Sequence, residues 1–287
     1  MPLSRHHIRS VVQSALEEDC AYNDATTSAT IGNSDIRASA HLVAKEYGII
    51  AGIPVAEEAF KTLDPQSEFV VYIDDGQTVE AGMRIASISG KASAILSAER
   101  TALNLLQRMS GIATLTARYI DAVRGTNTSI VDTRKTVPGL RVLDKYSVLM
   151  GGGGNHRMSL ADCILIKDNH ISAMRSRGMS IGDVVRHARS NAPFSIKIEI
   201  EVENVGDAVD AMNAGADIVM LDNMSPNAMH EAVKHRVGQA LLEASGNVTL
   251  ANVRQVAETG VDIISVGELT HSPDALDISL DFSVDSE

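Results

Sequence analysis

The sequence has few cysteines, a deficit of positive charge and no long apolar run, and each shortage excludes a class of protein. The two cysteines, Cys20 and Cys163, have neither metal-ligand nor disulfide spacing, which favours a reducing, cytosolic setting. With 25 Lys and Arg against 37 Asp and Glu, the formal net charge of −12 disfavours nucleic acids and acidic membranes as partners. No stretch of uninterrupted apolar residues is long enough to span a bilayer. We therefore expect a cytoplasmic protein that binds neither nucleic acid nor membranes.

The N-terminal part of the chain predicts a helix followed by short strands. An amphipathic helix, not a signal peptide, is expected after Ser4, a suitable N-cap residue. Its apolar stripe consists of Ile8, Val11, Val12, Ala15 and Leu16. Alternating segments separated by Gly, Asp and Pro then indicate strands, and residues 92–123 predict a long helix with a possible break at Gly111.

From Ser129 onward, short apolar strands alternate with helix-like runs that end in glycine. Repeated strand, helix and strand favour parallel strands joined by crossover helices. The strand candidates are SIVDTR, DCILIKD, SIKIEIEV, ADIVMLDN, QALLEASG and VDIISVGE. The tail, DISLDFSV, alternates again and is expected to return to the first domain as an edge strand.

Polar residues mark the C-terminal ends of nearly all these strands. They are Asp132, Thr133, Arg134 and Lys135; Lys167 and Asp168; Glu201; Asp222; Glu243 and Ser245; and Gly267 and Glu268. In a parallel α/β barrel these ends share one rim, where the chemistry lies. A doubly wound open sheet would instead gather ligands near a switch point. Six separate strand ends favour the barrel.

The segment from Val131 to His170 is net positive inside a negative chain. Its six cations are Arg134, Lys135, Arg141, Lys145, Arg157 and Lys167, against four aspartates. Arginine suits two-point contacts with carboxylates and phosphates, and lysine supplies a mobile point charge, so the segment predicts an anion site. Solvated surface charges are the alternative.

The glycines at 151–154 predict a loop over the anion or a tight turn. His156 is interpreted as a substrate contact or a hydrogen-bonded core histidine, and Cys163 as core.

The segment SIKIEIEVE, residues 195–203, alternates strictly between apolar and charged side chains. If its apolar face packs on the outer helices, the charged face looks into the barrel, where Lys167 or Arg134 would compensate it. Glu201 and Asp222 offer hard oxygen ligands of the kind that Mg²⁺ binds together with substrate phosphate. An exposed edge strand with a solvated polar face is the alternative.

Two short motifs end the last two strand candidates. EASGN (Glu243–Asn247) and SVGEL (Ser265–Leu269) offer small residues with free backbone N–H groups before a helix, which suits an anion. The loops after the last two strands of a barrel are frequent phosphate sites, so the pair predicts phosphate binding.

These motifs, taken together, resemble the quinolinate phosphoribosyltransferases. The matching runs are AERTALNLLQRMSGIAT, DTRKTVPGLR, GGGGNHRMSLAD, LIKDNHI, EIEVEN, IVMLDN, LEASGNVTLANV and TGVDIISVGELTHS, so the resemblance covers the chain from Leu16 onward. It implies a small α/β N-terminal domain, placed at residues 1–112 with 271–287 returning to it, and an open α/β barrel at 113–270. It also implies a homodimer or higher homo-oligomer. The implied reaction, with Mg²⁺, joins quinolinate and phosphoribosyl pyrophosphate into nicotinate mononucleotide, pyrophosphate and CO2.

The resemblance also implies roles for individual residues. The quinolinate carboxylates would be held by Arg134, His156, Arg157 and Lys167, with Arg100 supplied in trans by the partner subunit. Lys135 would serve the pyrophosphate side, and Glu201 and Asp222 the ribose hydroxyls and Mg²⁺. Ser245, Gly246, Asn247 and Gly267 would cradle the 5′-phosphate, and Thr133, Val266 and Glu268 join the substrate-binding set. Catalytic roles fall to Lys135, Lys167, Glu201 and Asp222.

Two rival functions are weighed on the same residues. A paralogue with another acceptor, such as the molybdenum-locus homologues, is disfavoured by the intact carboxylate-binding residues Arg134, His156 and Arg157. The segment DDGQTVEAGMRIASISG resembles a biotinyl-type hairpin, but a carrier needs a lysine at the tip. None lies between Asp74 and Met83.

Overall fold

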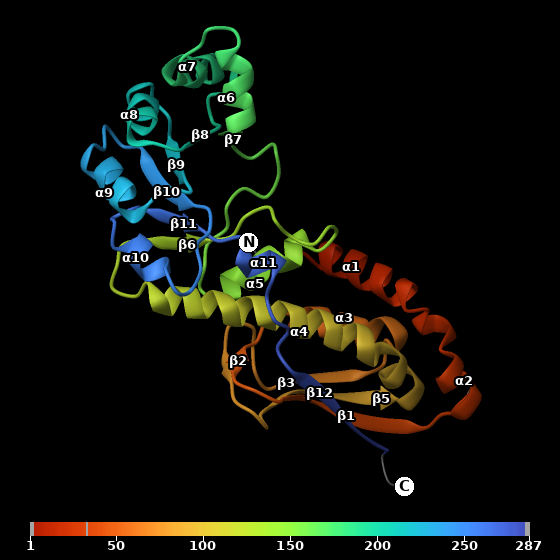
Figure 1. Ribbon diagram of the computed structural model, residues 1–287. Coiled ribbons are helices and arrows are strands. Elements are labelled where there is room, and N and C mark those ends of the chain that lie inside the picture. The colour runs from red at the N-terminus through yellow and green to blue at the C-terminus, as the bar shows by residue number, and fades with distance from the viewer. Residues whose placement is uncertain (1–2, 33, 285–287) are drawn as a thin grey trace. The chain divides into compact units, whose positions relative to one another are not determined.

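The computed structural model describes residues 3–32 and 34–284, which form two compact units (Figure 1). The first unit contains residues 1–117, 136–152 and 269–287, and the second contains 118–135 and 153–268. Residues 1–2, 33 and 285–287, which the expected first domain includes, lie outside the described part. Within that part, no helix has both the length and the apolar character that crossing a membrane requires.

The first unit contains a four-stranded antiparallel sheet of order β12-β1-β5-β3. Its strands are β1 (Arg37–Ala44), β3 (Glu68–Val71), β5 (Arg84–Lys91) and β12 (Ile278–Val284), beside a separate pair, β2 (Gly48–Ile49) and β4 (Thr78–Val79). Ala38, Ala40 and Leu42 alternate along β1 and are fully buried, which gives the sheet one apolar face. The alternating tail forms β12, an edge strand paired with β1.

Helices cover the apolar face of this sheet. They are α1 (Arg5–Glu18), the 3-10 helix η1 (Ala21–Asn23), α2 (Ala25–Thr30), α3 (Ile53–Leu63), α4 (Ala92–Ala122) and α5 (Arg141–Met150). The Ser4 hydroxyl caps α1 by accepting the N–H of His7 at 3.2 Å, and Ile8, Val12 and Leu16 of the predicted stripe are buried. Figure 1 shows α3 and α4 over one face of the sheet, and their apolar residues join its core.

Helix α4 runs without interruption through Gly111, so the break considered at this glycine is wrong. The glycine instead permits a close approach of the returning chain. A Cβ atom at position 111 would overlap the backbone oxygen of Asp274. On the same helix, Gln107 accepts the N–H of Leu276 at 3.0 Å and donates its side-chain amide to the oxygen of Ile278 at 2.7 Å.

Residues 136–152, expected in the barrel, belong to the first unit. An ion pair helps to hold them there: the Arg108 guanidinium donates from Nε and Nη2 to the buried Asp144 carboxylate at 3.0 and 2.9 Å. Burial raises the pKa of Asp144, and Arg108 opposes that rise. Arg141 and Lys145, which contributed to the positive segment, therefore lie on α5 in the first unit.

The second unit is an open α/β barrel with six parallel strands in the order β6-β11-β10-β9-β8-β7. The strands are β6 (Ser129–Val131), β7 (Ile164–Ile166), β8 (Ile198–Val202), β9 (Ile218–Asp222), β10 (Leu241–Ser245) and β11 (Ile263–Ser265). The helices are α6 (Asp168–Arg175), α7 (Ile181–Asn191), α8 (Val205–Asn213), α9 (Pro226–Lys234) and α10 (Val253–Ala257), and α11 (Glu268–His271) begins at the last residue of this unit and continues in the first. Figure 1 shows α8, α9 and α10 on the outer side of the strands, as crossover connections require.

Glu199 and Glu201 of the charged face of residues 195–203 lie inside the barrel, as the alternation predicts, whereas Lys197 and Glu203 are exposed. Glu199 is fully buried on β8, between buried Ile198 and Ile200, and Glu201 is nearly so. The solvated edge-strand alternative is therefore wrong. The interpretation of Cys163 as core is also wrong, because this residue precedes β7 and is only partly buried.

Replacement of Gly111 by alanine tests the close approach on α4. We expect Gly111→Ala to lower the free energy of unfolding by about 2 kcal/mol or more, because backbone atoms cannot move aside as a side chain can. Gly182→Ala on α7 is the matched control, since its Cβ would meet only the flexible end of Arg186, at 3.2 Å. Equal unfolding free energies for the two variants, measured in urea, would contradict the packing described.

Candidate active site

The C-terminal ends of the barrel strands surround a pocket of about 680 Å³. Its lining collects almost all the polar strand ends predicted from the sequence. The lining residues are Thr133, Arg134, Lys135, His156, Arg157, Leu165, Lys167, Asp168, Glu201, Glu203, Met220, Asp222, Asn223, Glu243, Ser245, Gly246, Asn247 and Ser265. Four Lys or Arg side chains thus face one pocket in a chain of net charge −12. Such a concentration of fixed cations favours an anionic ligand.

Arg134 follows β6 and presents an unsatisfied donor to this pocket. Its Nε is buried, and no hydrogen-bond partner for that atom exists among residues 3–32 and 34–284. A buried guanidinium N–H without an acceptor is costly unless a ligand supplies one. The neighbouring Thr133 hydroxyl accepts the N–H of Lys135 at 3.0 Å, which shapes the turn that carries Arg134.

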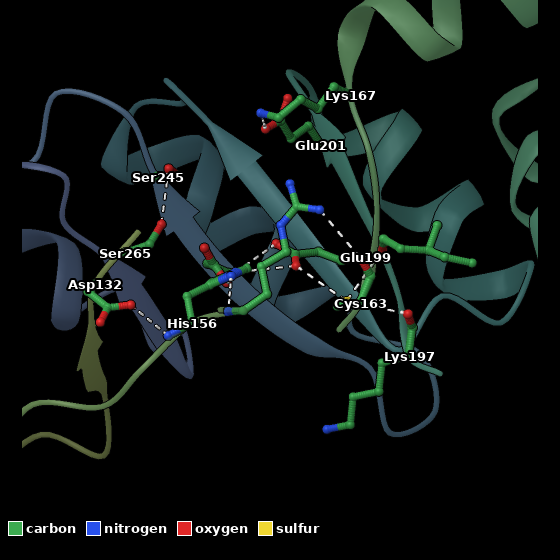
Figure 2. Close-up of polar contacts among 12 residues, drawn as sticks. Asp132, His156, Cys163, Lys167, Lys197, Glu199, Glu201, Ser245 and Ser265 are labelled. Carbon is green, nitrogen blue, oxygen red and sulfur yellow. Dashed lines mark hydrogen bonds and ion pairs between the residues drawn. The ribbon is translucent and has the colours of Figure 1, made fainter. Parts of the chain in front are cut away.

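Lys167 and Glu201 form an ion pair across the ends of β7 and β8 (Figure 2). The Lys167 side chain remains 45% exposed, whereas that of Glu201 is 14% exposed, so the ammonium faces the pocket while the carboxylate anchors it. The expectation that Lys167 compensates the inward face of β8 is confirmed. Arg134 makes no such contact with Glu199 or Glu201 within the described residues.

Glu201 and Asp222 end the neighbouring strands β8 and β9 and line the same pocket. Carboxylates on adjacent strands offer the hard oxygen atoms that Mg²⁺ prefers. Asp222 accepts a hydrogen bond from the amide of Asn223 at 2.9 Å, which leaves lone pairs for a further ligand. The donor set therefore fits a magnesium ion.

The loop after β10 has the shape of an anion cradle. Gly246 and Asn247 adopt positive φ angles of 89° and 51°, and a Cβ atom at Gly246 would overlap the side-chain oxygen of Asn223. Asn223 also accepts the Asn247 amide at 2.9 Å, and Ser265 donates to the Ser245 hydroxyl at 3.1 Å. Because these contacts fix the loop, its small residues stay open to the pocket.

The end of β11 contributes less to the pocket than expected. Val266 is buried, and its N–H donates to the Val131 oxygen at 2.9 Å, so this amide is already used. Val266, Gly267 and Glu268 are not among the lining residues, and Glu268 accepts a hydrogen bond from the Tyr119 hydroxyl. Arg100 is exposed on α4 of the first unit and is also outside the lining set.

His156 lies at the base of the pocket with both ring nitrogens engaged (Figure 2). Its Nε2 is 3.2 Å from Glu199 and 3.3 Å from Glu243, two carboxylates that are fully buried. In the neutral ring, Nδ1 accepts the N–H of Arg157 at 2.8 Å and Nε2 carries the proton, whereas in the imidazolium both nitrogens carry a proton. Burial lowers the pKa of His156, but the carboxylates of Glu199 and Glu243 outweigh burial and raise it to about 10.

The sequence analysis places Asp132 and Glu243 at strand ends and Glu199 on the inward face, but it does not predict that all three contact His156. Asp132 is fully buried and accepts hydrogen bonds from the His156 N–H at 2.9 Å and the Asn155 amide at 2.7 Å. It therefore holds the glycine-rich loop and does not line the pocket. The charged alternation in 195–203 was the available signal for Glu199, but its partner lies 43 residues away in the chain.

Comparison with known proteins identifies the family. Residues 24–110 match the N-terminal domain model of quinolinate phosphoribosyl transferase, and residues 112–281 match its C-terminal domain model. The chain is 44% identical to a probable nicotinate-nucleotide pyrophosphorylase (carboxylating) of Synechocystis, over 94% of this chain and 90% of that protein. It is 42% identical to a mitochondrial quinolinate phosphoribosyltransferase (decarboxylating) of Nicotiana tabacum, over 98% of this chain and 83% of that one.

Solved structures agree with the sequence comparison. The crystal structure of NadC from Streptococcus pyogenes superposes with a TM-score of 0.93 at 36% identity and covers 100% of both chains. Both domain models, the curated relatives and this structure point to one family. This chain belongs to the quinolinate phosphoribosyltransferase family.

Proposed function

We propose that this chain transfers the phosphoribosyl group of phosphoribosyl pyrophosphate to quinolinate with decarboxylation, giving nicotinate mononucleotide, pyrophosphate and CO2 for de novo NAD biosynthesis. It would thus be a pentosyltransferase of the nicotinate-nucleotide pyrophosphorylase (carboxylating) class. The observation that carries the proposal is the buried Arg134 Nε, a donor without an acceptor in a pocket that three further Lys or Arg residues line. A dicarboxylate and a polyphosphate can share one pocket only where many fixed cations neutralise them.

The quinolinate end of the pocket is assigned to Arg134, Arg157 and Lys167. Guanidinium groups match carboxylates in two-point geometry, and Lys167 adds an ammonium already fixed by Glu201. His156 contributes positive charge at the base, with its pKa raised to about 10 by the carboxylates beside it. Thr133 shapes the turn that carries Arg134 and Lys135.

The phosphate end is assigned to the fixed loop of Ser245, Gly246 and Asn247, with Lys135 serving the pyrophosphate. Lys135 is exposed at the pocket, as suits a mobile charge that meets a leaving group. Glu201 and Asp222 would hold Mg²⁺ and the ribose hydroxyls. When bound, the ion supplies positive charge that stabilises the departing pyrophosphate.

Catalysis on this view depends on positioning and electrostatics. The ribosyl transition state is expected to be oxocarbenium-like, so acids such as Glu201 and Asp222 near the ribose stabilise its positive charge. Fixed cations hold the ring nitrogen of quinolinate in line with the sugar. After ribosylation the cationic ring accepts the electron pair left by the departing 2-carboxylate, so decarboxylation requires little acid or base assistance from the chain.

The proposal includes a homodimer or higher homo-oligomer and a cytoplasmic location. Arg100, which is exposed on α4, would complete the quinolinate subsite in trans, as the family resemblance implies. Cys20 and Cys163 are both free, which favours a reducing compartment.

Quinolinate turnover tests the function, and Arg134 tests the site. The chain should consume quinolinate when phosphoribosyl pyrophosphate and Mg²⁺ are present and release nicotinate mononucleotide.

Arg134→Ala should weaken quinolinate binding roughly 10- to 100-fold, the value of a charge-assisted hydrogen bond, without changing the melting temperature. Arg186→Ala on α7, where the side chain is 61% exposed, is the control. No product under any condition rejects the function, and unchanged affinity removes Arg134 from the site.

Mixing two inactive variants tests whether Arg100 acts in trans. Arg100→Ala and Lys167→Ala subunits should each be nearly inactive alone. After joint refolding of equal amounts, about half of the dimers are mixed, and each mixed dimer has one intact site of two. Activity should therefore return to about a quarter of the wild-type value. If mixed preparations regain no activity, Arg100 does not act across the subunit interface.

A further inference from the structure

Polar residues on β8 and β10 form two successive layers of the barrel interior. Glu201 and Ser245 line the pocket at the ends of β8 and β10. Glu199 and Glu243 precede them by two residues on the same strands, so they point to the same face one layer deeper. The deeper pair is fully buried, and neither carboxylate oxygen of Glu243 accepts a hydrogen bond from any described residue.

The charge of this deeper layer is compensated by His156. A carboxylate that is buried without hydrogen-bond donors costs several kcal/mol in free energy, and an apolar residue in the same place would avoid that cost. The ion pairs with the His156 Nε2, at 3.2 Å from Glu199 and 3.3 Å from Glu243, offset part of it. A costly arrangement of this kind at the base of a pocket indicates a functional constraint on the position of His156.

His156 is directly followed in the chain by Arg157, one of the cations that line the pocket. Asp132 fixes the backbone at this point by accepting the N–H of His156 at 2.9 Å. A second cavity, of about 410 Å³, lies on the far side of this cluster and is lined by His156, Arg157 and Glu243 together with residues at the strand starts, such as Lys197 and Ile218. Without the carboxylates, the ring would have open space to move into on that side.

We propose that Glu243, together with Glu199, is a positioning residue that holds His156 from beneath and thereby fixes Arg157 in the quinolinate subsite. His156 acts in this arrangement as a strut, because the carboxylates hold its ring at Nε2, Asp132 holds its backbone N–H, and Arg157 follows it directly in the chain. The inference rests on the proposed function, because it names the subsite that the strut supports.

A double-mutant cycle with Glu243→Gln and His156→Gln tests the proposal. Both replacements keep a polar side chain: Glu243→Gln removes a buried negative charge, and His156→Gln removes the positive charge that faces it. Glu243→Gln should weaken quinolinate binding about tenfold, because the neutral amide no longer attracts the His156 imidazolium, with affinity for phosphoribosyl pyrophosphate unchanged. The double variant should bind quinolinate no more weakly than the weaker single variant, because both act through one contact. Glu231→Gln, on the exposed face of α9, is the control for the chemical change.

The outcomes separate the inference from the function it rests on. Additive losses in the double variant, or quinolinate binding by Glu243→Gln within about twofold of wild type, overturn the inference while wild-type turnover still supports the function. A wild-type chain that neither binds nor consumes quinolinate overturns both. If Glu243→Gln does not fold, Glu199→Gln takes its place in the same cycle, because the two carboxylates meet the same nitrogen.

Discussion

Charge compensation beneath the pocket is the constraint on which the rest of the site depends. Cations that are to meet a dicarboxylate and a polyphosphate must stay in place before those ligands arrive, and they repel one another. The chain meets this requirement with fixed acids: Glu201 holds Lys167, and the buried pair Glu199 and Glu243 holds His156. Each acid sits on a strand, which is the most rigid support that the fold offers.

The parallel barrel makes this compensation possible. All six strands point the same way, so residues two apart on one strand form successive layers of the interior. The outer layer carries groups that face the pocket, such as Glu201 and Ser245, and the layer below carries Glu199 and Glu243. The loop after β10 adds a different element, a backbone fixed by Asn223 with small residues exposed toward the pocket.

Much of the fold and the site could be predicted from the sequence, because local patterns determine them. The stripe after Ser4 forms α1, the alternating tail forms β12, and the polar strand ends meet at one pocket. Features that depend on distant contacts could not be predicted. Residues 136–152 belong to the first unit, where Asp144 pairs with Arg108, 36 residues away. Gly111 serves a close approach to Asp274, and the buried partners of His156 lie on strands far along the chain.

A crystal structure of the chain with quinolinate tests the central claim most directly. The account predicts that the ligand lies at the C-terminal ends of the barrel strands, with one carboxylate accepting a hydrogen bond from the Arg134 Nε and contacts to Arg157 and Lys167. Quinolinate bound elsewhere, with the Arg134 Nε still lacking an acceptor, would contradict it.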